Sequence, residues 1–145
     1  MIPLSRTASG IIAVTLRVAL GGFFLWSGAE KLRDLPAFLA SIRSFHILDD
    51  PYAAWLAMGL PWLEILAGTA LVTGFLVEGG LALIAGMLAV FLWAIIYSWQ
   101  RGLNITCGCF GAQAESSTYT ELIVRDALLL TLAAALLLHR RRQER

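Results

Sequence analysis

The chain has 145 residues, of which 59% are hydrophobic and only 14% are charged, and its formal net charge is +1. Soluble domains carry roughly a quarter charged residues, so this composition argues against a water-soluble domain. The nearly neutral charge offers no basic field for nucleic acid. Two cysteines are too few for a disulfide scaffold. We therefore expect a single membrane domain over residues 1–145, with the lipid bilayer as its main partner.

Four apolar stretches are long enough to cross a bilayer, whose hydrocarbon core needs about 20 apolar residues per helix. They cover residues 9–29, 53–77, 80–99 and 120–138. Backbone groups in lipid must find hydrogen-bond partners within their own segment, so each stretch is predicted to be a helix. The predicted fold is therefore all-α, an integral membrane four-helix bundle.

The connections between these spans carry their own signals. After the first span, apolar residues recur at helical spacing, which is typical of a short amphipathic helix on the membrane surface. These residues are Leu35, Phe38, Leu39, Ile42 and Phe45. Glu78 and Gly79 are predicted to form a tight hairpin between the second and third spans. Thr118 and Glu121 have capping-box spacing before the fourth span.

Basic residues concentrate in the C-terminal tail, residues 139–145, which predicts a cytoplasmic C-terminus by the positive-inside rule. Four spans then place the N-terminus on the same side. The loop over residues 100–119 is consequently expected on the external face.

That loop contains the only cysteines, Cys107 and Cys109, separated by Gly108. A Cys-X-Cys bridge closes a very small ring, and strained disulfides are the labile, oxidising kind. Glycine allows the sharp bend that such a ring needs. We predict that the two cysteines are a catalytic pair for thiol–disulfide exchange. A structural bridge, a soft-metal site for copper or zinc, and bonds to other partners are the alternatives.

Charged residues also interrupt the apolar spans, where an unpaired charge costs several kcal/mol. Arg17 and Glu64 fall at similar depths on antiparallel neighbours, so we expect them to pair. Arg125 and Asp126 follow the cysteine loop by about one helical turn, and they could pair with Glu30 or Lys31.

These charges are interpreted either as a structural ion-pair network or as a site for proton transfer or a quinone headgroup. The candidate cofactor-binding residues are Arg17, Glu64, Arg125, Asp126, Trp99 and Phe110. No metal site is assigned.

Small residues mark one helical face on each of the first two spans, and such faces let helices approach closely. The first face comprises Arg17, Gly21, Phe24 and Gly28. The second comprises Ala57, Pro61, Glu64, Gly68 and Leu71.

With these residues in view, the chain resembles the MauE/DoxX group of small four-helix membrane proteins. The landmarks are Arg17 with Gly21, Gly28-Ala29-Glu30-Lys31-Leu32, Leu60-Pro61-Trp62-Leu63-Glu64, Cys107-Gly108-Cys109-Phe110-Gly111 and Leu122-Ile123-Val124-Arg125-Asp126. The Cys-Gly-Cys-Phe-Gly element favours the MauE branch.

The resemblance implies a bacterial inner-membrane protein that assists maturation of the disulfide-rich methylamine dehydrogenase, alongside a periplasmic thioredoxin-like partner. By analogy with other disulfide-generating membrane enzymes, a membrane quinone could be the cofactor. A non-enzymatic scaffold or assembly subunit, and a protein handling soft metals or small solutes, are the alternative functions.

Overall fold

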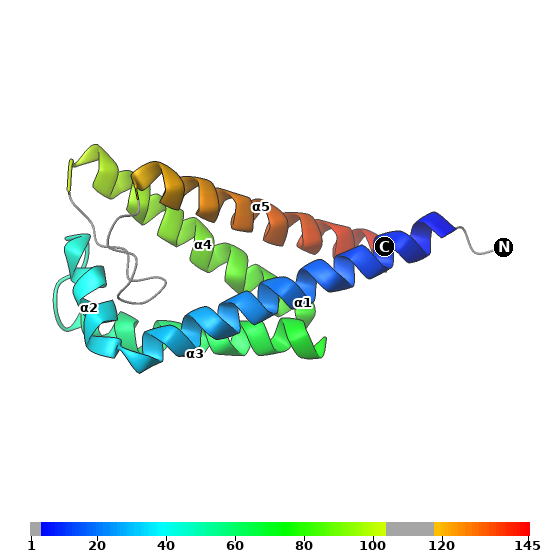
Figure 1. The fold of residues 1–145 in the computed structure, drawn as a ribbon, viewed down its shortest axis with the longest axis horizontal. Helices are drawn as coiled ribbons and strands as arrows, with labels where there is room; N and C mark the ends of the chain where they lie inside the picture. Colours follow the sequence, from blue (N-terminus) through cyan, green and yellow to red (C-terminus); the bar gives the residue numbers. More distant parts are fainter. Residues whose placement is uncertain (1–3, 104–117) are drawn as a thin grey trace.

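The computed structural model describes residues 4–103 and 118–145, and every regular element within them is a helix (Figure 1). The helices are α1 (Leu4–Arg33), α2 (Leu35–Ser44), α3 (Tyr52–Thr73), α4 (Val77–Gln100) and α5 (Tyr119–Glu144). All except α2 are long and apolar enough to cross a membrane. The prediction of an all-α membrane bundle is confirmed.

The short helix predicted between the first two spans is α2. Asp34 caps its N-terminus by accepting a hydrogen bond from the backbone N–H of Ala37, at 3.1 Å. Phe38 and Ile42 are buried against α3, where Ala53 is fully buried. One face of α2 is therefore packed on the bundle, while its position at the membrane surface remains a prediction.

The hairpin between the second and third spans lies earlier than predicted. Helix α3 ends at Thr73, and Gly74 adopts a left-handed conformation with φ of +80°. Helix α4 then begins at Val77, so Glu78 lies in its first turn, where a carboxylate complements the helix dipole. The prediction was wrong because the turn residues that follow Gly74 are themselves apolar, which hides the turn within a continuous apolar run.

The start of the fourth span is confirmed. Thr118 and Glu121 form a reciprocal capping box, in which the backbone N–H of Thr118 donates to Glu121 Oε2 at 3.3 Å. Helix α5 continues to Glu144, so the basic tail is helical rather than a separate segment.

Helices α1 and α3 touch backbone to backbone along the two predicted small-residue faces. A Cβ atom added to Gly68 would lie 2.6 Å from the carbonyl oxygen of Gly21. One added to Gly28 would lie 2.9 Å from the carbonyl oxygen of Pro61. Such contacts leave no room for any side chain, so the close approach depends on these glycines.

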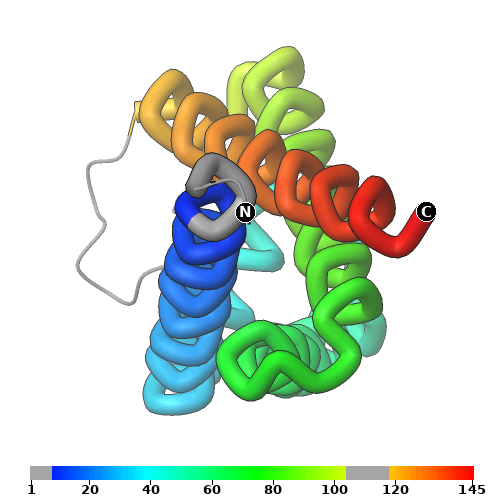
Figure 2. Tube along the Cα trace, turned by 90° about the vertical axis from the view of Figure 1, so that its right-hand side faces the viewer, coloured from blue at the N-terminus to red at the C-terminus, as the bar shows by residue number. Residues whose placement is uncertain are grey.

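The bundle consists of two closely packed pairs, α1 with α3 and α4 with α5 (Figure 2). One apolar core joins the pairs and includes Leu20, Phe24, Leu71, Leu81 and Ile84. Helix α2 lies at one end of the bundle, and the start of α1 and the end of α5 lie toward the other (Figure 1). The side of the membrane that each end faces stays a prediction from the sequence.

Candidate functional site

A buried ion pair joins α1 to α3 at the α2 end of the bundle. Lys31 Nζ lies 2.5 Å from Glu64 Oε1, and their side chains are only 3% and 8% exposed. Lys31 Nζ also donates to Ser27 Oγ at 3.0 Å. From α2, the ring of Phe38 lies 5.3 Å from the same nitrogen, within cation–π range. Three helices therefore position this one ammonium group.

The predicted pair of Arg17 and Glu64 is wrong. Glu64 packs beside Gly28, whose added Cβ would lie 3.3 Å from Glu64 Cβ. Arg17 lies eleven residues earlier on α1, about 16 Å away at 1.5 Å per residue. Side chains on a helix also lean toward its N-terminus, so Lys31 leans toward Glu64 and Arg17 leans away from it.

A second ion pair lies on α5. Arg125 Nη2 is 3.1 Å from Asp126 Oδ1, and the Asp126 residue is only 3% exposed. Neither residue forms the ion pair with Glu30 or Lys31 that the sequence suggested: within the described ranges, Glu30 pairs with Arg33 at 2.8 Å. The two members of the second pair are thus neighbours in the sequence.

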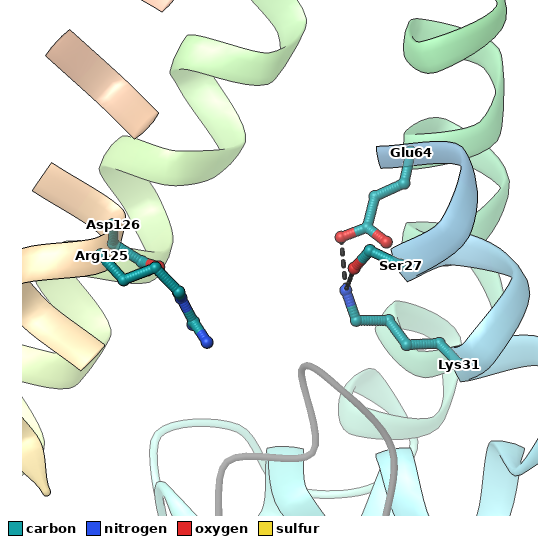
Figure 3. Close-up of polar contacts among 5 residues, drawn as sticks. All are labelled: Ser27, Lys31, Glu64, Arg125 and Asp126. Atoms are coloured by element: carbon teal, nitrogen blue, oxygen red, sulfur yellow. Dashed lines mark hydrogen bonds and ion pairs between the residues drawn. The ribbon is translucent and has the colours of Figure 1, made fainter. Parts of the chain in front are cut away.

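The two ion pairs face each other across a small cavity of about 40 Å³ (Figure 3). Two buried carboxylate oxygens among the described residues, Glu64 Oε2 and Asp126 Oδ2, have no hydrogen-bond partner. Buried polar atoms are normally satisfied, and this volume would hold roughly three water molecules at 10–15 Å³ each. The cavity therefore presents two unused acceptors to a donor, from water or from a ligand.

An apolar groove of about 470 Å³ adjoins this polar cavity and lies between α2, α3 and α4. Helices α3 and α4 are close at the hairpin, where a Cβ on Gly80 would lie 2.6 Å from Leu71 Cδ1, and they diverge toward α2 (Figure 1). Leu60, Met87 and Phe91 line both the groove and the polar cavity. A few convergent polar groups beside a large apolar space are typical of a ligand site.

The structure brings together three of the predicted site residues, Glu64, Arg125 and Asp126. Arg17 lies away from these residues, near Gly74 at the C-terminal end of α3. Trp99, at the end of α4, is 58% exposed and does not line the cavity. Cys107, Cys109 and Phe110 lie outside the described residues. These three therefore remain predictions from the sequence.

Sequence reasoning named Lys31 only as a candidate partner and missed Ser27. Their spacing of four residues carried a signal, because positions i and i+4 share one face of a helix. That face also carries Phe24, which is buried in the core and lines the cavity. Three residues of this α1 face thus contribute to the site.

The residues that flank the cysteine-bearing segment are fixed at the α2 end of the bundle. The Tyr119 hydroxyl donates a short hydrogen bond to the carbonyl oxygen of Leu103, which ties the start of α5 to the chain beyond α4. Arg101 donates to the carbonyl oxygen of His46 at 3.2 Å, which ties the same region to the chain after α2. Leu103 and Tyr119, described residues on either side of segment 104–117, therefore lie at the end of the bundle that holds the two buried ion pairs.

Comparison with known proteins places this architecture in a family. The model of the family "Methylamine utilisation protein MauE" matches residues 9–139, a range that includes both ion pairs and both cysteines. The methylamine utilization protein MauE of Paracoccus denitrificans is 30% identical over 122 residues. The alignment covers 83% of this chain and 66% of that relative, and no solved structure matches. The chain belongs to the methylamine utilisation protein MauE family.

Proposed function

We propose that this protein is a redox accessory factor for methylamine utilisation, which exchanges disulfides with a periplasmic thioredoxin-like partner through Cys107 and Cys109. Family membership and the Cys-Gly-Cys spacing support the proposal. One structural observation carries the proposal. The hydrogen bond from Tyr119 to Leu103 joins the two residues that flank the cysteine segment, at the end of the bundle that holds the polar cavity. In a bacterial inner membrane, that end would face the periplasm and both termini would face the cytoplasm.

The proposed exchange proceeds through a mixed disulfide. A thiolate of the partner attacks one sulfur of the Cys107–Cys109 disulfide, and the other sulfur leaves as a thiolate. The partner's second thiolate then attacks the mixed disulfide, which leaves the partner oxidised and the Cys107–Cys109 pair as a dithiol. Two electrons and two protons have passed from the partner to this protein.

A membrane quinone is the proposed acceptor of those electrons. Oxidation of one dithiol to a disulfide releases two electrons and two protons, which convert one quinone into one hydroquinone. The apolar groove is suited to the ring and tail, which would lie against Phe91, Met87 and Leu60. The polar cavity is too small for a ring, but it offers acceptors on Glu64 and Asp126 for hydroquinone hydroxyl groups.

The redox state of the cysteines in isolated membranes tests the proposal. We expect a reduced thioredoxin-fold protein to convert the pair from disulfide to dithiol, and an added short-tail quinone to restore the disulfide. Acid quenching followed by alkylation with a maleimide of large mass resolves the two states on a gel. A pair that keeps one redox state through both additions would contradict the exchange.

Filling the groove should block the quinone step alone. Gly86 lines the groove, and a Cβ added there has no atom within 4 Å, so Gly86→Leu occupies the space without backbone strain. We expect reoxidation by quinone to slow at least about tenfold, the effect of losing roughly 1.4 kcal/mol of binding. Reduction by the partner should be unchanged.

Gly22→Leu is the matched control, because Gly22 is exposed on α1 and also has open space around it. Reoxidation rates are followed by the same alkylation assay in both variants. Equal slowing in the two, or no slowing in Gly86→Leu, would remove the groove from the proposed pathway.

A further inference from the structure

Arg17 is a charged residue of α1 for which the described part of the chain provides no acidic partner. Its Nε atom is buried and makes no hydrogen bond. The guanidinium lies beside the C-terminus of α3, where a Cβ on Gly74 would be 3.5 Å from Arg17 Nη2. The negative end of the α3 dipole offsets part of the charge. The dipole does not give the Nε–H a hydrogen-bond partner, so this donor of Arg17 is available to an external anion.

A second pocket, of about 150 Å³, is lined by Arg17. Helix α5 contributes His139, Arg140 and Gln143 to its wall. Its described lining residues include two arginines and no acidic residue. The nearest acidic candidate on α4, Glu78, is already paired with Arg141 at 2.7 Å. Arg140 is itself paired with Glu144, at 3.5 Å between side chains that are 42% and 56% exposed. Among the described lining residues, the uncompensated positive charge of the pocket is therefore that of Arg17.

The remaining lining is apolar. It comprises Gly10, Ala13, Val14, Val77, Leu81 and Leu136. The pocket thus has a cationic part formed by Arg17 and the end of α5, and an apolar part between α1, α4 and α5. A ligand that matches both parts carries an anionic group joined to a hydrocarbon chain.

From this arrangement we infer a binding site for an anionic phospholipid at the end of the bundle that carries the termini. Arginine presents several N–H donors in a planar fork that matches the oxygens of a phosphate. Basic pockets between transmembrane helices commonly bind anionic headgroups. The Arg17 and Arg140 guanidinium groups would hold the phosphate, while Val14, Leu81 and Leu136 contact the acyl chains. This site is independent of the proposed redox function.

Lipid retention by the purified full chain tests the inference. The protein is placed in nanodiscs of phosphatidylcholine that contain a minor fraction of phosphatidylglycerol, and bound lipid is counted by native mass spectrometry. We expect preferential retention of phosphatidylglycerol. Arg17→Gln and Arg140→Gln should each weaken it about tenfold, as expected for loss of one charge-assisted hydrogen bond.

Arg142→Gln is the matched control, because Arg142 is exposed on the same helix end and does not line the pocket. It removes the same charge and should leave retention unchanged. Equal weakening in all three variants would indicate a diffuse electrostatic effect and overturn the site. Competition by inorganic phosphate as effective as that of phosphatidylglycerol would overturn the lipid as occupant. If Arg140→Gln left phosphatidylglycerol retention unchanged, the proposed site would also be overturned. This result counts even if Arg17→Gln fails to fold.

Discussion

Replacing Glu64 by alanine is expected to lower the free energy of unfolding by about 3 to 5 kcal/mol, the usual cost of breaking a buried ion pair from one side. The substitution leaves the Lys31 ammonium with 3% exposure and without its carboxylate. Ser27 and the Phe38 ring remain near it, but neither supplies a negative charge. The free energy can be measured by titrating the protein with SDS in mixed micelles.

A double variant separates the charge effect from packing. Glu64→Leu combined with Lys31→Met replaces the pair by apolar side chains of similar volume, which is often close to neutral. We therefore expect most of the stability to return. Glu30→Ala is the control at a more exposed pair, since Glu30 is 25% and its partner Arg33 77% exposed, and pairs open to solvent contribute about 1 kcal/mol or less. If Glu64→Ala cost no more than Glu30→Ala, the buried pair would not hold α1 on α3.

Replacing both Cys107 and Cys109 by serine is expected to abolish the function while leaving the bundle folded. Formation of active methylamine dehydrogenase in a host that depends on this chain should fall to the level seen without the protein. Serine cannot form the disulfide that the exchange consumes. The helix contacts described above involve neither cysteine, so expression and stability in detergent should match those of the native chain.

Ser117→Ala provides a control within the same segment, and it should retain full function. Enzyme activity in cell extracts and the amount of chain in membranes are measured together. A double-serine variant that still supports full activity would identify the protein as a scaffold rather than a redox factor.

The sequence predicts the membrane helices well because bilayer thickness imposes a length on each apolar run. It also predicts the contact of α1 with α3, since only glycine permits the approach seen at Gly21 and Gly68. The hairpin was misplaced because hydropathy does not register a turn made of apolar residues. The local signal in the sequence was Gly74 itself, because glycine readily adopts the left-handed conformation that ends α3.

The buried charges show that the depth of a residue along a predicted span does not by itself identify its ion-pair partner. Assigning Glu64 to Arg17 assumed equal heights on antiparallel helices and neglected the lean of side chains toward each helix N-terminus. Lys31 was therefore not predicted as the partner of Glu64, with which it forms the ion pair. The polar cavity and its neighbouring groove depend on how α3 and α4 diverge, which is a tertiary feature without a sequence motif.

The most direct measurement of the proposed chemistry is capture of the partner by a single-cysteine variant in native membranes. Cys107→Ser or Cys109→Ser leaves one sulfur able to form a mixed disulfide that no neighbouring thiol can resolve. At least one variant is predicted to give an adduct that disappears on reduction, is missing from the double-serine chain, and contains a thioredoxin-fold protein by mass spectrometry. If neither variant forms an adduct while the native pair stays oxidised throughout, these cysteines do not exchange disulfides.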